Sequence, residues 1–324
     1  MYVLELAGQD DDFAAYEAES AASDVSILAP GLATARGLTD RIEQLAFTHR
    51  ASELLGQSDA AVADARALLE ASKLDRTGSV AVRAVDVRGT TGVDTQQVER
   101  ELGSVLVDRG FAVDLDDPDH ELRALFSGSD DGLCALGWLA TESDRDFTRR
   151  QPTDKPFFQP GSMDAMLARA LVNMAGARPG ATVLDPMCGT GGILVEAGLV
   201  GARVLGVDAQ EKMVRGTRDN LRAFLDGGWD VLQGDAARLP LGDDVADAVV
   251  FDTPYGRQSR IEGTLGQLVS DALAEARRVA PRCVVVGDRP WAQPAKMAGW
   301  RTEAAFQRRV HRSLTRYIVV LRRA

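Results

Sequence analysis

Lysine is almost absent from this chain, and cysteine and histidine are scarce. Only four of the 37 basic residues are lysine, which leaves 33 arginines. The three cysteines, Cys134, Cys188 and Cys283, and the three histidines are scattered without the paired spacing that a zinc site needs. The sequence therefore predicts no metal centre, and it predicts reduced, mostly buried thiols.

Long hydrophobic runs are missing as well. No run of about 18 apolar residues is present to span a bilayer, and the segment MYVLELAGQDDD carries acids where a signal peptide carries lysines. We therefore expect a cytoplasmic protein with no membrane partner. With 324 residues, 45% of them hydrophobic, the chain is long enough for two domains with separate cores.

Basic charge is in deficit: the formal net charge is −11 and the isoelectric point is about 4.9. This balance argues against a nucleic-acid partner, which a basic patch would bind. However, aspartate outnumbers glutamate and arginine replaces lysine, a composition that indicates the salt-rich cytoplasm of a halophilic archaeon. In molar salt the Debye length is about 3 Å, so distant acids barely repel a phosphate that arginine contacts directly. An RNA partner thus stays open beside the alternative of an ordinary acidic enzyme.

The first 140 residues mix short strands with helices, which is typical of an α+β region. Strands are expected over 2–6, 79–85, 111–115 and 122–126, and helices from about residue 12 and over 95–108. The stretch 141–155 is polar and lacks periodicity, so it marks a domain boundary.

Apolar runs alternate with helical segments in the second half. The runs are 182–185, 203–207, 231–232, 248–251 and 283–286, a pattern that predicts a doubly wound parallel α/β sheet. The last two strands, expected over 301–309 and 316–321, have no helix between them. They predict a terminal antiparallel hairpin, as in the Rossmann-like sheet of class I methyltransferases.

A glycine turn follows the first of these strands. The strand ends at Asp185, the turn contains Gly189 and Gly191, and a helix begins near Gly191. Glycines let the backbone approach a ligand closely, the helix N-terminus favours a carboxylate, and Asp185 can meet an ammonium group. A dinucleotide-binding loop is the competing interpretation, but the third glycine is missing and Asp185 would repel a pyrophosphate.

Two further acids end the next strands. Asp208 lies 19 residues past Gly189, where it could bind a ribose diol, although nicotinamide enzymes share this feature. Asp235 could accept a hydrogen bond from an adenine amine while the Ala236 amide donates to the ring. A simple turn explains this last pair equally well.

The segment Asp252-Thr253-Pro254-Tyr255 decides the class of chemistry, because it follows the fourth strand at the edge where such sheets bind ligands. It resembles the Asp/Asn-Pro-Pro-Tyr motif of amino-methyltransferases. The resemblance implies that the acid and the next backbone carbonyl accept hydrogen bonds from the target amine and that the tyrosine stacks on the base. Such acceptors are needed because a conjugated amine is poorly nucleophilic and has to be oriented toward the methyl donor.

Thr253 departs from this motif, which has proline at that position. A threonine can supply the same backbone carbonyl, although with a less rigid turn. Restoring the proline is expected to preserve activity, provided that the Thr253 amide makes no essential hydrogen bond.

Taken together, the sequence resembles the archaeal tRNA (guanine-10-N2)-methyltransferases, which form mono- and dimethylguanosine. The segments 155–163, 168–173 and 310–317 extend the resemblance. It implies S-adenosylmethionine as cofactor, tRNA as partner, and four parts: a ferredoxin-like module over 1–52, a THUMP RNA-binding domain over 53–140, a linker over 141–156 and the methyltransferase domain over 157–324. The sequence leaves open a homodimer or a small activator protein.

The resemblance assigns roles residue by residue. For the target base it implies Asp252, Thr253, Pro254 and Tyr255. For the cofactor it implies Phe158, Pro160, Asp185, Cys188, Gly189, Gly191, Asp208, Asp235 and Ala236. Candidate phosphate contacts are Arg149, Arg150, Arg257, Arg260, Arg312 and Arg316.

Two alternatives stay open at this point. One is another base amino-methyltransferase, acting on guanine N2 at a different tRNA position or on adenine N6 of DNA. The other is a non-catalytic RNA-binding protein with a relic methyltransferase fold, which intact Asp185, Asp208 and Asp252 disfavour.

Overall fold

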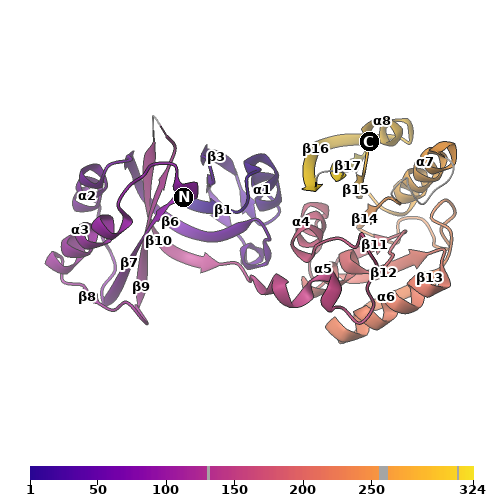
Figure 1. Cartoon of the computed structure of the whole chain (residues 1–324), viewed down its shortest axis with the longest axis horizontal. Helices are drawn as coiled ribbons and strands as arrows, with labels where there is room; N and C mark the ends of the chain where they lie inside the picture. Colours follow the sequence, from indigo (N-terminus) through magenta and orange to yellow (C-terminus); the bar gives the residue numbers. More distant parts are fainter. Residues whose placement is uncertain (130–131, 255–261, 312–313) are drawn as a thin grey trace. The chain divides into compact units, whose positions relative to one another are not determined.

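The chain divides into two compact units, Met1–Asp144 and Arg145–Ala324. Figure 1 shows the computed structural model, which describes residues 1–129, 132–254, 262–311 and 314–324. The division falls within the stretch 141–156 that the sequence marks as a linker. Among the described residues, no helix is both long and apolar enough to cross a membrane.

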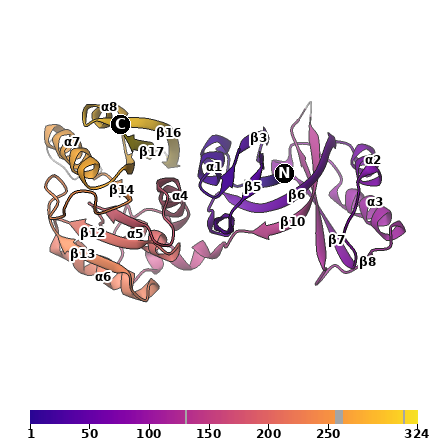
Figure 2. The ribbon, with the colours of Figure 1, turned by 180° about the vertical axis from the view of Figure 1, so that it is seen from behind.

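The N-terminal unit is built around one sheet. Its strands are β1 (Tyr2–Leu6), β3 (Ser26–Ala29), β4 (Leu32–Ala35), β6 (Thr48–Asp59), β7 (Ser79–Asp86), β8 (Ala112–Val113), β9 (His120–Ser127) and β10 (Leu133–Glu142). They lie in the order β3-β4-β1-β6-β10-β9-β7-β8, while β2 (Ala22–Ser23) pairs separately with β5 (Gly37–Leu38). The helices are α1 (Asp11–Ala18), α2 (Val62–Ala71) and α3 (Thr95–Asp108), with 3-10 turns at Asp40–Gln44 and Val87–Gly89. This unit is therefore α+β, as predicted (Figure 2).

Helix α3 has the bounds that the sequence predicts. Its start is fixed by Asp94, whose side chain accepts a hydrogen bond from the Gln97 amide at 3.1 Å. The expected apolar face is buried and shares a core with the neighbouring α2 and with the sheet. The buried residues of that face are Val98, Leu102, Val105 and Leu106.

The strand predicted over 111–115 is wrong in extent, because only Ala112–Val113 pair with the sheet. Phe111 is buried in the core beside α3. On the other side, the Asp114 carboxylate accepts hydrogen bonds from the amides of Asp116 and Asp117, at 3.0 and 3.1 Å. These local bonds turn the chain away from the sheet.

Strand β6 runs without a break through residue 52, where the sequence places the end of a ferredoxin-like module. It pairs with β1 on one side and with β10 on the other. Segments on both sides of residue 52 thus share one sheet. The division into a ferredoxin-like module and a THUMP domain stays a prediction.

The second unit contains a seven-stranded sheet. Its strands are β11 (Thr182–Asp185), β12 (Arg203–Asp208), β13 (Trp229–Gln233), β14 (Ala248–Asp252), β15 (Arg282–Gly287), β16 (Trp300–His311) and β17 (Leu314–Arg323). They lie in the order β13-β12-β11-β14-β15-β17-β16; β11 to β15 are parallel, and β16 and β17 form the antiparallel hairpin. The doubly wound sheet with a terminal hairpin is confirmed.

Helices cover both faces of this sheet. They are α4 (Ala165–Ala175), α5 (Gly192–Leu199), α6 (Glu211–Phe224), α7 (Glu262–Val279) and α8 (Ala292–Met297), preceded by 3-10 turns at Asp146–Arg150 and Pro152–Asp154. Helix α5 packs against both α4 and α6. Residues of α7 and α8 share one core cluster with β14, β15 and β17. Strands β11, β14 and β15 are therefore largely buried, and the carboxyl ends of the parallel strands are left as the edge where loops can form a site.

Candidate active site

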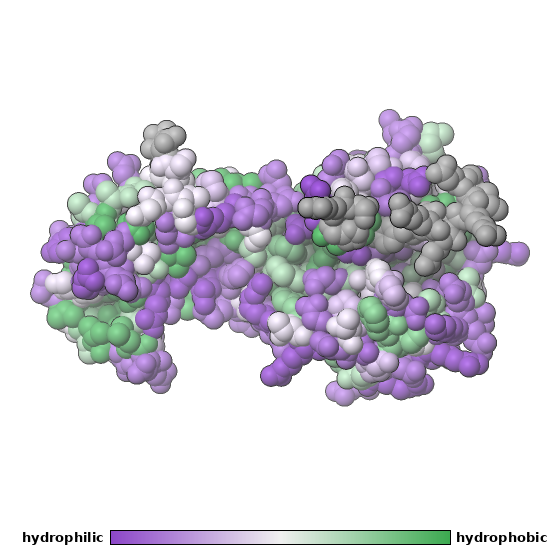
Figure 3. Space-filling view, in the orientation of Figure 1, coloured by the Kyte–Doolittle hydropathy of each residue, from purple (hydrophilic) through white to green (hydrophobic). Residues whose placement is uncertain are grey.

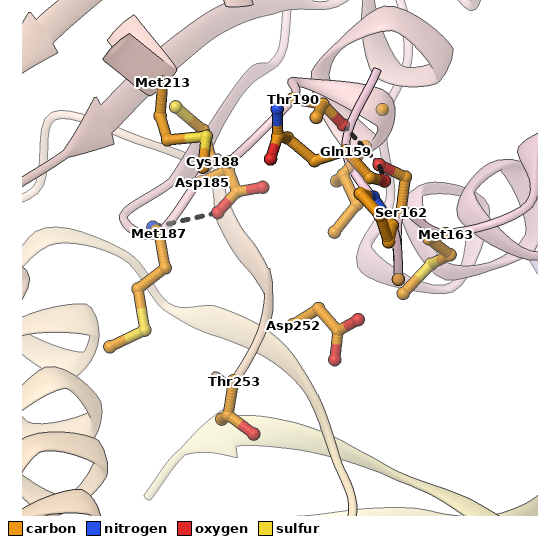
Figure 4. Close-up of a pocket in the computed structure, with 15 residues that line it drawn as sticks. Gln159, Ser162, Met163, Asp185, Met187, Cys188, Thr190, Met213, Asp252 and Thr253 are labelled. Carbon is orange, nitrogen blue, oxygen red and sulfur yellow. Dashed lines mark hydrogen bonds between the residues drawn. The ribbon is translucent and has the colours of Figure 1, made fainter. Parts of the chain in front are cut away.

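Two adjoining cavities, of about 200 and about 390 Å³, lie at the carboxyl ends of β11, β12 and β14. Both are lined by Met187, Gly189, Met213 and Asp252. Figure 4 shows the smaller cavity, with Asp185 and Asp252 facing the same space. The structure thus brings together residues from separate strands and loops that the sequence assigns to one site.

Most of the predicted cofactor and base residues line these cavities. The smaller cavity is lined by Pro160, Asp185, Cys188, Gly189, Asp252 and Thr253. The larger cavity is lined by Gly189, Asp208, Asp235, Ala236, Asp252 and Pro254. Phe158, whose surface is 41% exposed, and Gly191 lie outside both linings. Tyr255 lies outside the described residues.

The glycine turn is held by hydrogen bonds to the neighbouring strand and helix. The Gly189 amide donates to the Asp208 carboxylate at 3.0 Å, and the Thr217 hydroxyl donates to the Gly189 carbonyl at 2.7 Å. Gly191 has a φ of +74°, and a Cβ there would lie 2.7 Å from the Thr217 side chain. Gly191 therefore shapes the turn without touching the cavity.

Asp185 is a buried carboxylate, with 2% of its surface exposed. Burial raises its pKa well above the usual value, and the negative charges of Asp208 and Asp252 raise it further. The Asp185 carboxylate accepts a hydrogen bond from the Met187 amide at 3.0 Å. In the part of the chain that the structure describes, no ion pair joins Asp185, Asp208 or Asp235 to an arginine or lysine.

This arrangement fits a cationic nucleoside ligand. S-adenosylmethionine carries a sulfonium and an ammonium group, which suit a cavity walled by carboxylates. Cys188 lies in the same wall, but burial raises its pKa well above the usual value, so it is a neutral thiol. The larger cavity extends past Asp208 to Asp235 and Ala236, as an adenosine would need.

Thr253 is almost fully buried, with 1% of its surface exposed. Its backbone amide donates a hydrogen bond to the Val286 carbonyl at 2.9 Å. Its hydroxyl has no hydrogen-bond partner within the described ranges, and Figure 4 shows it pointing away from Asp185. The Thr253 backbone is therefore fixed against β15, and no contact gives its hydroxyl a role.

The segment that precedes α4 closes one side of the smaller cavity with Gln159, Gly161, Ser162 and Met163. The Ser162 hydroxyl lies 3.1 Å from that of Thr190 in the glycine turn. This side of the site thus comes from residues just after the linker.

Sequence reasoning missed Asn220, which holds this segment in place. Its side chain accepts a hydrogen bond from the Phe157 amide and donates to the carbonyls of Phe157 and Thr190, each at 2.8 Å. Asn220 is fully buried. The signal was an asparagine three residues after Thr217 on the buried face of α6.

Lys155 begins the segment 155–163 and is in the lining of neither cavity. It is 5% exposed, and its ammonium has no hydrogen-bond partner among the described residues. A Cβ on Gly192, at the start of α5, would lie 3.3 Å from the ammonium. Burial lowers the pKa of Lys155, while the nearby Glu196 carboxylate opposes that shift.

The predicted phosphate contacts separate into different environments. Arg149 is exposed and pairs with Asp146 at 3.2 Å. The phosphate contact predicted for Arg150 is wrong. Its side chain is buried and pairs with the fully buried Glu196 at 2.8 Å, so it is not available to a phosphate. Arg316 is buried beside Asp252, at 3.7 Å. Arg257, Arg260 and Arg312 lie outside the described residues.

Comparison with known proteins identifies the family. Residues 152–318 match the RMKL-like methyltransferase domain. The chain is 35% identical over 288 residues to the tRNA (guanine(10)-N2)-dimethyltransferase of Methanothermobacter thermautotrophicus, which covers 87% of this chain and 84% of that protein.

Two further comparisons extend this result. The chain is 34% identical over 239 residues to the tRNA (guanine(6)-N2)-methyltransferase of Thermus thermophilus, covering 72% and 68% of the two chains. The crystal structure of TrmN from Thermus thermophilus superposes with a TM-score of 0.52 and 24% identity over 100% of this chain and 99% of that one, which shows a shared fold. The chain is an S-adenosylmethionine-dependent methyltransferase, and it belongs to the family of the archaeal tRNA (guanine(10)-N2)-dimethyltransferases.

Proposed function

We propose that this protein methylates the exocyclic N2 amine of guanine 10 in tRNA, adding one or two methyl groups. The observation that carries the proposal is the Asp252 carboxylate, which lies at the carboxyl end of β14 in a cavity shared with the buried Asp185. The names of the relatives supply the base and its position.

The residues of the Asp252 motif act on the amine. The Asp252 carboxylate and the Thr253 backbone carbonyl accept hydrogen bonds from the two N–H groups of the amine. These hydrogen bonds turn the nitrogen lone pair toward the methyl group that is transferred. The hydrogen bond from the Thr253 amide to Val286 holds that carbonyl in place. Tyr255 supplies a stacking ring for a base that has left its helix. S-adenosylmethionine, when bound, supplies the methyl group from its positively charged sulfonium sulfur.

The remaining acids hold the cofactor. Asp185 binds its ammonium, Asp208 its ribose hydroxyls, and Asp235 its adenine amine, with the Ala236 amide donating to the ring. The cavity linings support these roles, because Asp185 lies in the smaller cavity and the other residues in the larger one. Gln159 and Ser162 close the methionine end.

The N-terminal unit binds the tRNA, through the THUMP domain that the sequence predicts. It has a cleft of about 380 Å³ whose lining includes Arg83, Arg100, Val113 and Leu115. Val113 and Leu115 are more than half exposed, and Figure 3 shows hydrophobic areas among hydrophilic ones on the face of this unit. Arg83 and Arg100 supply charges that can contact phosphates, and the acidic Glu99 lies in the same lining. The enzyme acts in a salt-rich cytoplasm, where arginine contacts withstand screening.

A second candidate target is guanine N2 at another tRNA position. The Thermus relative, which is named for guanine 6, favours keeping this alternative. Both candidates use the same site residues, so only mapping of the modified nucleotide separates them.

The experiment that tests the amine-binding role is Asp252→Ala. Methyl transfer to tRNA should fall at least 100-fold, because an acceptor of the reacting amine is lost, while the cofactor Kd from calorimetry stays within a few-fold. Asp219→Ala is the matched control, since Asp219 is exposed on α6 and pairs with Arg222. Loss of cofactor binding without a separate catalytic defect would contradict the role of Asp252.

A further inference from the structure

Arg316 lies at the same edge of the sheet as Asp252. Ile318 of β17 lies opposite Val286 of β15, and Val286 lies opposite Asp252 of β14. Because side chains alternate along a strand, Arg316, two residues before Ile318, points to the same face as Asp252. Strand β17 is antiparallel to β15, so its first residues lie at the carboxyl ends of the parallel strands.

The guanidinium of Arg316 lies beside the acid, although Arg316 itself is in the lining of neither cavity. One nitrogen, Nη2, lies 3.7 Å from Oδ2 of Asp252 and 3.5 Å from the carbonyl oxygen of Gly161. Asp252 and Gly161 both line the smaller cavity. Only 5% of the Arg316 side chain is exposed. A phosphate on the surface of an RNA could not reach a group buried to that degree, which removes the role that the sequence suggested.

A base reaching Asp252 would instead present its edge to both residues. Along this edge of guanine stand the N2 amine, the N1–H and the O6 oxygen, that is, two donors followed by an acceptor. A carboxylate offers two acceptor oxygens, and a guanidinium offers hydrogens in a fixed fork. The Asp252 oxygen nearer to Arg316 would take N1–H, and Arg316 would face the atom that follows, O6.

We propose that Arg316 is a specificity-determining residue that donates to O6 of the target guanine while Asp252 accepts from N1–H and from the amine. The proposal rests on the proposed function, because it assumes a guanine whose N2 amine meets Asp252. Arginine is a common donor to guanine O6 in nucleic-acid recognition. Here the donor is fixed in advance by its contacts with Asp252 and Gly161.

The test uses tRNA transcripts with guanine or 2-aminopurine at position 10. 2-Aminopurine keeps the amine but lacks O6 and N1–H. Wild-type enzyme should show a kcat/KM for methylation of the 2-amine at least ten-fold higher with guanine. Arg316→Met should reduce the guanine rate and shrink the guanine preference at least five-fold relative to wild type. The intrinsic reactivity difference between the bases cancels in this comparison. Arg322→Met, which breaks an exposed ion pair with Glu303 on the same hairpin, should leave the preference unchanged.

A second measurement needs no folded variant. 2,6-Diaminopurine carries an amine in place of O6, so its hydrogens would oppose those of Arg316. Wild-type enzyme should methylate its 2-amine more slowly than that of 2-aminopurine. Two results would overturn the proposal. One is an equal loss of kcat/KM on guanine and on 2-aminopurine in Arg316→Met. The other is methylation of 2,6-diaminopurine by wild-type enzyme as fast as that of 2-aminopurine. If wild-type enzyme fails on the guanine transcript itself, the proposed function fails instead.

Discussion

The backbone amide of Thr253 donates a hydrogen bond of 2.9 Å to the carbonyl oxygen of Val286. The residue after Asp252 is thereby tied to β15, and the carbonyl that we assign to the target amine belongs to this fixed peptide. The sequence alone favoured proline as a harmless replacement, on the condition that this amide makes no essential bond.

We expect Thr253→Pro to be harmful. Proline has no amide hydrogen, so the buried Val286 carbonyl loses its donor, at a cost of about 1 to 3 kcal/mol in the free energy of unfolding. Urea denaturation and a methylation assay measure the two effects. Thr253→Val is the control, because it keeps the amide and removes only a hydroxyl without a partner among the described residues. A stable, active Thr253→Pro beside an inactive Thr253→Val would show that the hydroxyl is the working group.

Asp185→Asn should stabilise the protein in the absence of cofactor. Burial raises the pKa of Asp185, so the folded wild type loses stability as the pH rises from about 4 through that raised value. Asparagine has no charge to bury and can still accept from the Met187 amide. The free energy of unfolding of the variant should exceed that of wild type at pH 8, with a smaller excess at pH 5.

The same variant should bind the cofactor at least ten-fold more weakly, because the charge that meets the ammonium is gone. Denaturation curves at pH 5 and pH 8, followed by calorimetry, measure both effects. A wild type that is more stable than Asp185→Asn at pH 8 would mean that the carboxylate already has a compensating partner in the protein.

Glu196→Ala should destabilise the second unit strongly. Glu196 is fully buried and pairs with Arg150 and with Arg169, at 2.8 Å each. Its removal leaves two buried guanidinium groups without their acid, at a cost of about 3 to 5 kcal/mol. Glu211→Ala, which breaks an exposed pair with Arg215, should change stability by less than about 0.5 kcal/mol. Similar melting temperatures for the two variants would show that the buried cluster contributes no more than a surface pair.

Deletion of residues 1–144 should separate chemistry from RNA binding. The remaining unit keeps its own core and both cavities, so it should fold and bind the cofactor with a Kd within a few-fold of that of the full chain. Methylation of tRNA should fall at least ten-fold, because the unit proposed to hold the tRNA is gone. Full activity of the fragment would remove that role from the N-terminal unit.

Strands β11, β14 and β15 could be predicted from the sequence because they are largely buried and form short apolar runs. Strands β6 and β10 were not predicted. Their mutual pairing shifts register twice, between Leu136 and Gly137 and between Leu139 and Thr141, so no simple alternation marks them. The glycine turn and the strand-end acids were found because their spacing along the chain is itself the signal.

The directions of the arginine side chains could not be read from the sequence. Arg150 and Arg316 were both expected at phosphates, yet one pairs with Glu196 and the other with Asp252. Their partners lie 46 and 64 residues away along the chain, and only the packing of α5 and of the terminal hairpin brings them together. The position of an arginine near a motif therefore predicted the part of the fold in which it lies, but not the group that its side chain contacts.

The most direct test of the account is to map the methyl group. The enzyme is incubated with isotope-labelled S-adenosylmethionine and unmodified tRNA transcripts that carry guanine or inosine at position 10, and the modified nucleotide is located by mass spectrometry. Inosine lacks only the exocyclic amine. The account predicts labelled N2-methylguanosine or N2,N2-dimethylguanosine at position 10 of the first transcript and no label at that position in the second. Label on the inosine, or on an adenine of either transcript, would contradict it.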